Sequence, residues 1–396
     1  MRNKYVNTSN ETRSHRKFIA LFGDGAKANY FSPGQINLIG EHTDYNGGYV
    51  FPAAISIGTF GVARKRTDSL VKVYSLNFET VGVIAFSLEN ELVNTPEANW
   101  GNFVKGYLLK LKEAGHAIQT GFELVIEGTI PNGSGLSSSA SLELLVGTVV
   151  NDLYHLGLDK LTLVQLGQKV ENEFIGVNSG IMDQFTIGFG EIGKAILLDT
   201  NTLKYELVPA EFGDYKIVIM NTNKRRELAD SKYNERRAEC EEALKRLQTK
   251  LEITALGQLT PTEFEENRAL IGDVTLEKRA KHAVYENERT KLAKTCLEAG
   301  ELQAFGQLLN ASHESLKNDY EVTGIELDTL AETAQGLSGV LGARMTGAGF
   351  GGCGIALVAT SEIETFITKL SATYLEKIGY AASFYVATIA DGARKL

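Results

Sequence analysis

A stretch rich in glycine and serine, residues 130–143, carries residue types that suit phosphate binding. Residues 121–127 before it alternate between apolar and polar side chains, which predicts a strand. Residues 140–153 repeat apolar side chains at helical spacing without a proline, which predicts a helix. Gly133 and Gly135 let the backbone approach a ligand, and the N–H groups at a helix start favour an anion. The stretch therefore indicates either a phosphate loop or a tight turn capped by serines.

Familiar nucleotide-binding loops do not match this stretch. The spacing from Gly128 to Gly133 suits a Walker A loop, but Ser134 stands where its lysine belongs. Gly133 and Gly135 begin a dinucleotide fingerprint, but Ser138 occupies the position of the third glycine. A phosphate loop at this place belongs to another class.

A second polar cluster spans residues 40–48, after a possible strand at residues 35–39. Its glycines and charged residues predict a loop. Glu41, His42 and Asp44 lie within four residues, and short acceptors of this kind suit the hydroxyls of a sugar or another polyol. Two other interpretations stay open. One is a metal site of hard oxygen ligands with one imidazole, and the other is a solvated polar turn.

Two carboxylates lie in apolar surroundings further along the chain. Asp183 stands among the apolar and glycine residues of segment 180–185, so we expect it to be partly buried. Such a carboxylate is either paired structurally or a general base with a tuned pKa. Glu171, near the end of a helix predicted over 161–173, is a second carboxylate with a possible metal role.

Three further features have both a functional and a structural interpretation. Trp100 precedes a helix predicted over 102–114, and it either lines an adenine pocket or packs in the core. Tyr233 lies on a charged helix predicted from 231 to about 251, where its hydroxyl binds a ligand or the ring simply covers the surface. Five of the eight residues 347–354 are glycine, which indicates close approach of the backbone to a ligand or to the opposite domain.

Composition narrows the class of protein. The length of 396 residues suggests two or three domains. A net charge of −9 without a basic block argues against nucleic acid as a partner. The cysteines are far apart and show no CxxC spacing, which favours a reducing compartment over a disulfide framework or zinc site. The polar residues 1–17 do not resemble a signal peptide, and the apolar runs are too short to span a bilayer. We expect a soluble cytoplasmic protein with no membrane partner.

The remaining patterns predict alternating strands and helices. Strands are expected over 71–74, 82–86, 195–198, 217–220, 355–358 and 383–389, and helices over 276–297, 302–316 and 362–378, with a short leading helix that ends near 18–23.

Taken together, the motifs at residues 40–48, 131–140, 180–185 and 347–352 resemble the galactokinase family. That family is part of the GHMP superfamily of small-molecule kinases, which includes homoserine, mevalonate and phosphomevalonate kinases. The resemblance runs from about Phe31 to the C-terminus. It implies an α/β (α+β) fold of two domains, with the active site in the cleft between them. The expected domains are a mixed-sheet N-terminal domain of residues 1–205 and a ferredoxin-like C-terminal domain of residues 206–396.

The resemblance also implies roles for individual residues. ATP and D-galactose would be the substrates, Mg²⁺ the metal, and galactose 1-phosphate the product of a monomeric enzyme. Asp183 would be the base that acts on the anomeric hydroxyl. The implied galactose-binding residues are Glu41, His42, Thr43, Asp44, Gly180 and Tyr233. The implied nucleotide-binding residues are Ser75, Trp100, Gly133, Ser134, Gly135, Leu136, Ser137, Ser138 and Ser139. The implied Mg²⁺ ligands are Ser139 and Glu171.

One position departs from the family pattern. Galactokinases carry arginine after the first Pro-Gly, facing the catalytic aspartate, whereas this chain has Gln35. A nearby arginine lowers the pKa of an aspartate by about 1–3 units, and glutamine supplies no charge. We expect substrates still to bind and turnover to be slower, by ~10²-fold for one lost charged donor. Lys224, Arg225 and Arg226 are the candidates for a substitute cation.

Three functions fit these observations. The first is an active galactokinase, and the second is a related sugar kinase such as an N-acetylgalactosamine kinase, because the pocket near the sugar C2 is not visible in a sequence. The third is a sensor that binds galactose and ATP without catalysis. Gln35 favours the sensor, whereas Glu171, Asp183 and the intact serine loop favour an enzyme.

Overall fold

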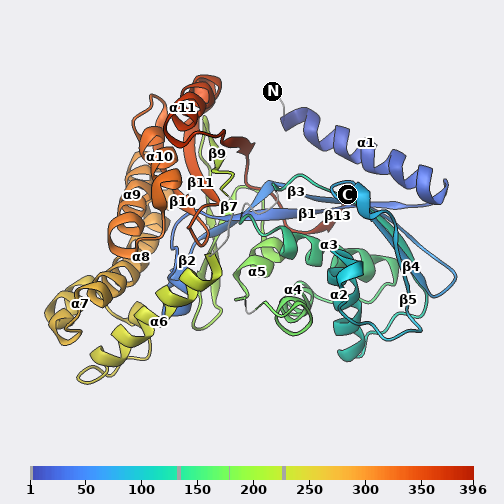
Figure 1. The fold of residues 1–396 in the computed structure, drawn as a ribbon, viewed down its shortest axis with the longest axis horizontal. Coiled ribbons are helices and arrows are strands. Elements are labelled where there is room, and N and C mark those ends of the chain that lie inside the picture. Colours follow the sequence, from blue (N-terminus) through green and yellow to red (C-terminus); the bar gives the residue numbers. More distant parts are fainter. Residues whose placement is uncertain (1–2, 132–134, 178, 225–228) are drawn as a thin grey trace.

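Two long antiparallel strands, β1 (Ala28–Asn37) and β3 (Pro52–Lys65), form the spine of the N-terminal half (Figure 1). The computed structural model describes residues 3–131, 135–177, 179–224 and 229–396. The other strands of the same sheet are β4 (Leu70–Ser75), β5 (Ile84–Ser87), β6 (Phe122–Gly128) and β13 (Arg394–Lys395). Within the described part of the chain, these form a six-stranded sheet in the order β13-β1-β3-β6-β4-β5. Strands β4 and β6 run parallel and the other neighbours antiparallel, so the sheet is mixed, as predicted.

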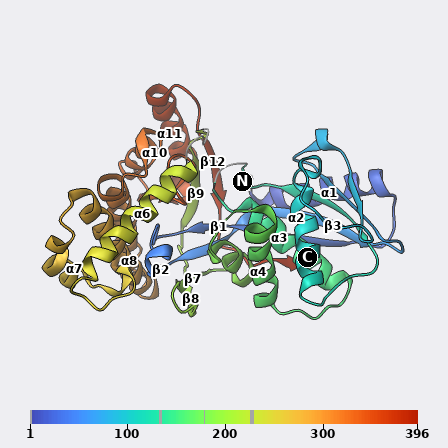
Figure 2. The same cartoon turned by 60° about the horizontal axis from the view of Figure 1, so that its bottom comes forward.

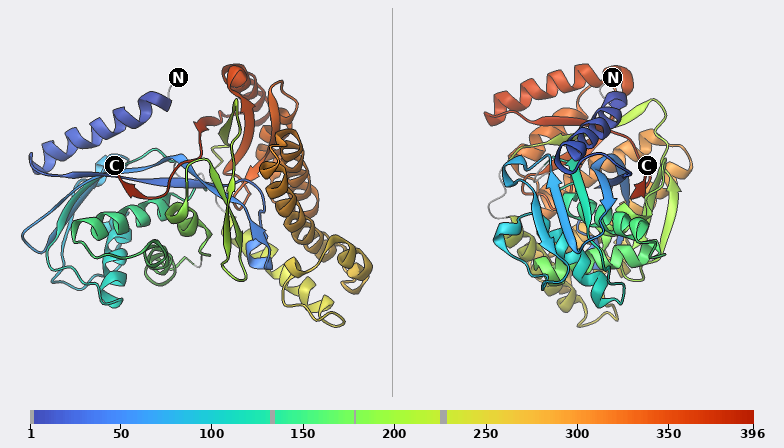
Figure 3. Two further views of the ribbon diagram at one scale, coloured as in Figure 1. Left: turned by 180° about the vertical axis from the view of Figure 1, so that it is seen from behind. Right: turned by 90° about the vertical axis from the view of Figure 1, so that its right-hand side faces the viewer.

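Helices cover both faces of this sheet (Figures 1 and 3). The first, α1 (Asn3–Phe22), crosses one face, and its fully buried Phe18 packs on Val62 and Val125. The expectation of a short leading helix was wrong, because only the last turns of α1 carry an apolar pattern. Just before these turns, a polar side chain contacts the sheet: Arg13 Nη1 donates to Glu127 Oε1 at 2.9 Å. The opposite face carries α2 (Gly101–Glu113), α3 (Ser138–Leu153), α4 (Lys160–Lys169) and α5 (Met182–Phe189).

The C-terminal half contains an antiparallel sheet, one face of which is covered by the helices at residues 324–335 and 363–378. Its strands are β9 (Tyr215–Asn221), β10 (Val340–Thr346), β11 (Cys353–Ala359) and β12 (Ser383–Ala387), and the covering helices are α10 (Gly324–Gln335) and α11 (Ile363–Ile378). The strands lie in the order β10-β11-β9-β12. A chain order of strand, helix, two strands, helix and strand with this arrangement is the ferredoxin-like topology, which confirms the predicted fold.

A helical insertion separates β9 from α10. It comprises α6 (Ala229–Leu247), α7 (Pro261–Asn267), α8 (Val274–Glu298) and α9 (Leu302–Ser315). Helix α6 packs along α8 (Figure 2). Helix α7 begins with a capping box, in which Thr260 and Glu263 satisfy each other's backbone N–H groups. A π-helical turn, η7 (Leu316–Tyr320), follows α9.

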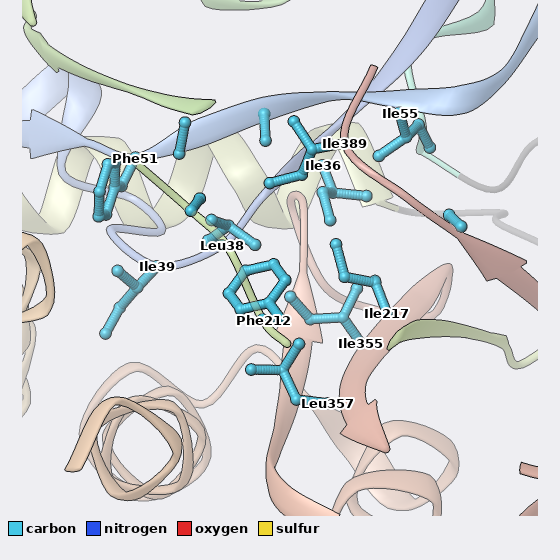
Figure 4. Packing of buried hydrophobic residues seen from close by; sticks show 14 of the residues in the cluster. Ile36, Leu38, Ile39, Phe51, Ile55, Phe212, Ile217, Ile355, Leu357 and Ile389 are labelled. Atoms are coloured by element: carbon cyan, nitrogen blue, oxygen red, sulfur yellow. The ribbon is translucent and has the colours of Figure 1, made fainter. Parts of the chain in front are cut away.

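One hydrophobic core joins the two halves (Figure 4). Ile36, near the end of β1, and Leu38, just after it, pack with Ile217 and Leu357 from the C-terminal sheet, and all four are almost fully buried. A three-stranded sheet lies beside this core, made of β2 (Tyr49–Val50), β7 (Lys194–Asp199) and β8 (Tyr205–Pro209). The chain ends by pairing β13 with β1, so the last residues lie on the N-terminal sheet. The shared core therefore fixes the end of β1, and the loop after it, against the C-terminal half.

Across the described residues, no helix combines the length and apolar character that a bilayer span requires.

Candidate active site

The loop between β6 and α3 brings a helix N-terminus to the junction of the two halves. Gly133 and Ser134 lie outside the described residues. Gly135 and Ser137 both have positive φ, 77° and 58°, and Ser137 directly precedes α3. The first turn of α3 contains Ser138 and Ser139 and no acidic residue, so the positive end of the helix dipole is not neutralised there. A non-glycine residue held at positive φ is strained, and such strain is common at functional sites.

The glycine-rich segment 347–352 faces this loop. A Cβ atom added at Gly347 would lie 3.7 Å from the carbonyl oxygen of Gly135. Leu136 is buried in the core that joins the two halves, and its carbonyl accepts a hydrogen bond from the Gln35 backbone N–H at 3.4 Å. Backbone from both halves therefore meets at the phosphate-loop candidate, as the density of glycine predicted.

Asp183 stands in the first turn of α5 and accepts a hydrogen bond from Gln35. The Gln35 Nε2 atom lies 3.0 Å from Asp183 Oδ1 and 3.0 Å from Ser137 Oγ. Burial of the Asp183 carboxyl raises the pKa to about 6, although the residue as a whole is only half-buried. The charges of Glu171 and Asp44 raise the pKa further, whereas hydrogen bonds from Ser137 and Gln35 lower it. This combination predicts a carboxyl group that changes protonation state close to neutral pH.

Of the cations proposed to replace the family arginine, only Lys224 lies in the described part of the chain, and it does not compensate this carboxyl. Among the described residues, none of the groups that act most strongly on Asp183 is cationic. Lys224 is paired instead with Glu326, and the Nζ to Oε2 distance is 3.0 Å. Arg225 and Arg226 lie outside the described residues.

Ser139 and Glu171 lie side by side, as the resemblance implied. Glu171 stands in a π-helical turn, η4 (Val170–Ile175), a local structure that is frequent at functional sites. Its Oε1 accepts from Ser139 Oγ at 2.5 Å and its Oε2 accepts from Ser179 Oγ at 2.5 Å. Within the described residues, no group of three or more His, Cys, Asp or Glu side chains could hold a metal ion. A hydroxyl and one carboxylate fit Mg²⁺, which usually binds one or two carboxylates and completes its shell with phosphates and water.

The loop at residues 40–48 turns several side chains toward the protein, Glu41 and Thr43 among them. Glu41 Oε1 accepts from the Gly347 backbone N–H at 2.7 Å, from the Thr346 hydroxyl at 3.2 Å and from Arg344 Nη1 at 3.4 Å. Burial raises the pKa of Glu41, and the charge of Arg344 opposes this rise. The Thr43 hydroxyl lies 2.8 Å from the Gly40 carbonyl oxygen and 2.7 Å from the Tyr49 carbonyl oxygen, so it closes the loop.

Asp44 and Tyr233 lie close enough to Asp183 for their charges to interact, and Gly180 comes shortly before the helix that carries Asp183. Burial raises the pKa of both Asp44 and Tyr233, and the charge of Asp44 acts on Tyr233 and on Asp183. No atom lies within 4 Å of a Cβ atom added at Gly180, so Gly180 borders open space. Asp44, Tyr233 and the open space beside Gly180 therefore lie near the Asp183 carboxyl.

His42 is enclosed by protein groups on both of its ring nitrogens. Its Nδ1 lies 2.7 Å from the Tyr45 hydroxyl and its Nε2 lies 3.2 Å from the Ala348 carbonyl oxygen. Burial lowers the pKa of His42 to about 3, so the ring is neutral. His42 is therefore part of the predicted loop, but both of its ring nitrogens already have protein partners and neither is free to bind a sugar hydroxyl.

The two nucleotide candidates outside the loop belong to the N-terminal half: Ser75 ends β4, and Trp100 directly precedes α2. Ser75 Oγ accepts from the Asn77 backbone N–H at 3.2 Å. Asn77, which the sequence did not indicate, exchanges two hydrogen bonds with the backbone of Gly128 at the end of β6. Trp100 packs in the core with residues of β4 and β6, in line with the structural interpretation. Its buried indole N–H has no hydrogen-bond partner among the described residues.

Several buried polar residues near the site carry no sequence signal. Glu143 lies one turn after Ser139 on α3, and its Oε2 accepts from Gln184 Nε2 at 3.0 Å. Burial and the charge of Glu171 raise the pKa of Glu143 well above its usual value. Most of these residues have a partner far away in the chain, and Ser179 contacts Glu171 across a turn, so local spacing could not reveal them. The other residues missed are Ser179, His282, Glu286, Tyr320 and Arg344.

Family models match three parts of the chain. Residues 102–191 match the GHMP kinases N terminal domain and residues 293–375 match the GHMP kinases C terminal model. Residues 16–65 match the galactokinase galactose-binding signature, which includes Gln35 and the loop at 40–48.

Relatives match over nearly the full length. Galactokinases of Enterococcus faecalis and Lactococcus lactis subsp. cremoris are 64% and 65% identical, over 96% of this chain and 98% and 95% of their own lengths. A crystal structure of Lactococcus lactis galactokinase complexed with galactose superposes with a TM-score of 0.91 at 63% identity, covering 97% of this chain and 99% of that one. Methanococcus jannaschii mevalonate kinase shares the fold at 21% identity, with a TM-score of 0.65 over 93% of this chain and all of its own. The chain belongs to the galactokinase family of the GHMP kinases.

Proposed function

We propose that this chain transfers the γ-phosphate of ATP to the anomeric hydroxyl of D-galactose and so forms galactose 1-phosphate. The observation that carries the proposal is the position of Asp183. Its carboxyl lies within hydrogen-bond distance of Gln35, which also bonds to Ser137 of the phosphate loop. Asp44, of the galactose-binding signature, is close enough to raise its pKa. A relative 63% identical to this chain has been described in complex with galactose, which supports galactose as the acceptor.

The phosphates of ATP bind at the N-terminus of α3. Backbone N–H groups of the loop and the helix dipole attract the phosphates, and Ser139 and Glu171 hold Mg²⁺. When bound, Mg²⁺ offsets the negative charge of the phosphates. The candidate residues on this side are Ser75, Trp100, Gly133, Ser134, Gly135, Leu136, Ser137, Ser138 and Ser139.

Galactose binds between the 40–48 loop and Asp183. Asp44, Tyr233 and the second carboxylate oxygen of Glu41 accept or donate hydrogen bonds to its hydroxyls, and Gly180 leaves room for the ring. His42 and Thr43 act on the sugar indirectly, because their polar atoms hold the loop.

Asp183 accepts the proton of the anomeric hydroxyl as the new P–O bond forms. A base with a pKa of about 6 is ionised at neutral pH and still basic enough to take the proton. Phosphoryl transfer depends on positioning and charge stabilisation more than on covalent help, so one base, one metal and the loop suffice. Gln35 positions Asp183 without adding positive charge, and turnover is slower than with arginine.

A non-catalytic sensor of galactose and ATP is the second candidate, and Gln35 is the observation that favours it. An assay of galactose-dependent ADP release from Mg-ATP separates the two. The enzyme releases ADP only when galactose is present, whereas a sensor binds both ligands without turnover. Repeating the assay with N-acetylgalactosamine tests the sugar preference.

We further propose that residues 1–205 and 206–396 form the two domains and that the chain acts as a cytoplasmic monomer. The ferredoxin-like sheet from 215 to 387 supports the placement of the second domain. Light scattering after gel filtration tests the monomer, with one species near 43.2 kDa as the expected result.

A further inference from the structure

A chain of hydrogen bonds ties the 40–48 loop to the C-terminal half. Cys240 Sγ lies 3.1 Å from the Tyr320 hydroxyl, which lies 2.7 Å from the Tyr45 hydroxyl. Tyr45 lies 2.7 Å from His42 Nδ1, and His42 Nε2 lies 3.2 Å from the carbonyl oxygen of Ala348. This series of hydrogen bonds begins on α6 and ends at the glycine-rich segment, and the two are more than a hundred residues apart in sequence.

The donor and acceptor of every hydrogen bond in this series follow from the last one, in which the Ala348 carbonyl oxygen is the acceptor. A carbonyl oxygen only accepts, so His42 carries its proton on Nε2, and Nδ1 of the neutral ring accepts from Tyr45. The Tyr45 proton is then used, so its oxygen accepts from Tyr320. By the same reasoning, the Tyr320 oxygen accepts from the Cys240 thiol, which itself accepts from Asn46 Nδ2 at 3.6 Å. All donors and acceptors are used without conflict.

Tyr320 is the residue on which these contacts converge. It is fully buried in the π-helical turn η7, and its ring lies between two imidazoles, with centroid distances of 4.8 Å to His42 and 4.5 Å to His282. His282 also holds the loop, since its Nε2 donates to the Glu41 carbonyl oxygen at 3.0 Å. Residues of the C-terminal half thus hold the 40–48 loop in place.

We propose that Tyr320 is a positioning residue for galactose, which orients the Tyr45 hydroxyl toward His42 and so holds the 40–48 loop. This inference rests on the proposed function. Tyr320 itself is fully buried. Its hydroxyl acts through Tyr45 and His42, whose rings pack on Tyr233 at 5.5 and 5.6 Å. Removing the hydroxyl would leave the Tyr45 oxygen without its donor and the Cys240 thiol without its acceptor.

The test compares galactose binding by the full chain and by Tyr320→Phe, which keeps the ring between the imidazoles and removes only the hydroxyl. An unsatisfied buried partner typically weakens a coupled interaction by about 10-fold to 100-fold. We expect the galactose Kd and KM to rise by at least about 10-fold. The KM for ATP should stay within about twofold, because the phosphate loop is not part of the chain of bonds.

A spectroscopic readout separates positioning from a general loss of stability. In ¹⁵N-histidine-labelled protein, His42 should show the pattern of an Nε2-protonated ring, assigned by its loss in His42→Asn. Tyr320→Phe should change the His42 Nδ1 signal. The Tyr45 oxygen would no longer accept a hydrogen bond from Tyr320, and this weakens the hydrogen bond that Tyr45 donates to His42 Nδ1.

Two matched variants serve as controls. Tyr30 is also fully buried and its hydroxyl donates to Asp152 at 2.7 Å, far from the loop in the N-terminal sheet. Tyr30→Phe should leave galactose affinity and the His42 signal unchanged. Cys240→Ser keeps a donor to Tyr320, whereas Cys240→Ala removes it and should weaken galactose binding in the same direction as Tyr320→Phe.

Unchanged galactose affinity and an unchanged His42 signal in a folded Tyr320→Phe would overturn the inference. Should that variant fail to fold, the contrast between Cys240→Ala and Cys240→Ser decides in its place, and equal galactose affinity of the two would overturn it. If the unaltered chain binds no galactose by calorimetry, the proposed function and this inference both fail. If the unaltered chain binds and the variants bind equally well, only this inference fails.

Discussion

The side-chain amide of Gln35 lies 3.0 Å from Asp183 Oδ1 and donates a hydrogen bond to it. The same nitrogen lies 3.0 Å from Ser137 Oγ, so one neutral side chain links the candidate base to the phosphate loop. The contact reproduces the position of an arginine but not its charge. Burial therefore keeps the pKa of Asp183 raised, to about 6, where a cation would lower it.

Replacing Gln35 by arginine should speed turnover and move its pH dependence. Asp183 must be ionised to accept a proton, so activity of the unaltered chain should fall as pH drops through about 6. A neighbouring arginine lowers the pKa of an aspartate by about 1–3 units, so the acid limb of kcat should move down by that amount. The positive charge should also raise kcat by ~10²-fold. Gln35→Leu, which removes the hydrogen bond without adding charge, should shift the acid limb upward. An arginine variant with the same kcat and the same acid limb as the unaltered chain would rule out this account of Gln35.

Asp183→Asn should abolish turnover and spare binding. Asparagine has nearly the same shape as aspartate, and its amide oxygen can still accept the hydrogen bond from Gln35. It cannot take the proton of the sugar hydroxyl. Loss of a general base typically costs about 10²–10⁴-fold in kcat. Galactose binding, measured by calorimetry, should persist. A variant that retains more than a tenth of kcat would show that Asp183 is not the base.

Changes at the Ser139 and Glu171 pair should appear as a higher Mg²⁺ requirement. Glu171→Gln removes the carboxylate charge and Ser139→Ala removes the hydroxyl, so each variant should need more Mg²⁺ for half-maximal activity. Of the two carboxylate oxygens of Glu171, Ser179 donates to Oε2, whereas Ser139 donates to Oε1. Ser179→Ala should raise the Mg²⁺ requirement less than Glu171→Gln, because Ser179 only orients Glu171 and does not bind the metal itself. Such orienting residues typically contribute about 10–100-fold to metal affinity. Titration of activity with Mg²⁺ at fixed ATP measures all three. Equal Mg²⁺ requirements in the unaltered chain and Glu171→Gln would contradict the metal assignment.

Arg344 should be important for stability. It is fully buried and lies 3.4 Å from Glu41 Oε1 and 3.9 Å from Glu286 Oε1. Although burial alone would raise the pKa of Glu286, the charges of Arg289, His282 and Arg344 lower it to about 2. Arg344→Met leaves both carboxylates without this cation and should lower the free energy of unfolding by about 3–5 kcal/mol.

The control for this change is an exposed ion pair of similar chemistry. Arg237 and Glu241 are one helical turn apart and solvent-exposed, at 3.0 Å. Arg237→Met should cost no more than about 0.5 kcal/mol. Urea unfolding of both variants measures the difference, and equal losses would show that Arg344 does not act as a buried counter-ion.

Two buried imidazoles should make the protein sensitive to acid. Burial lowers the pKa of His42 to about 3 and that of His282 to about 4, from an ordinary value of 6.5. Between these values and 6.5 the unfolded chain binds protons that the folded chain does not, so stability is full above 6.5 and falls as pH decreases. His282→Asn should flatten the slope of unfolding free energy against pH between 6.5 and 4.

His155, which is exposed, offers the comparison. His155→Asn should leave that slope unchanged. An identical slope for His282→Asn would show that the buried imidazole does not drive the acid sensitivity.

The local chemistry of the site was largely predictable, and its long-range contacts were not. Glycine and serine spacing indicated the loop before α3, and the turn that carries Asp183 was indicated by its apolar neighbours. By contrast, Tyr320 lies in a helical insertion where its ring looks like an ordinary core residue, and its role depends on His42, almost 300 residues earlier. Lys224 illustrates the same limit, because its pairing with Glu326 could not be read from either segment. Fold class followed from motif order, whereas the length of α1 did not, since contacts such as Arg13 with Glu127 leave no periodic pattern.

The most direct test of the central claim is phosphate transfer itself. The unaltered chain is incubated with Mg-ATP and galactose, and ADP release is measured beside mass analysis of the sugar product. We predict galactose-dependent ADP release, formation of galactose phosphorylated at the anomeric oxygen, and a faster reaction with Gln35→Arg. Binding of both ligands without any sugar phosphate in either chain would contradict the account.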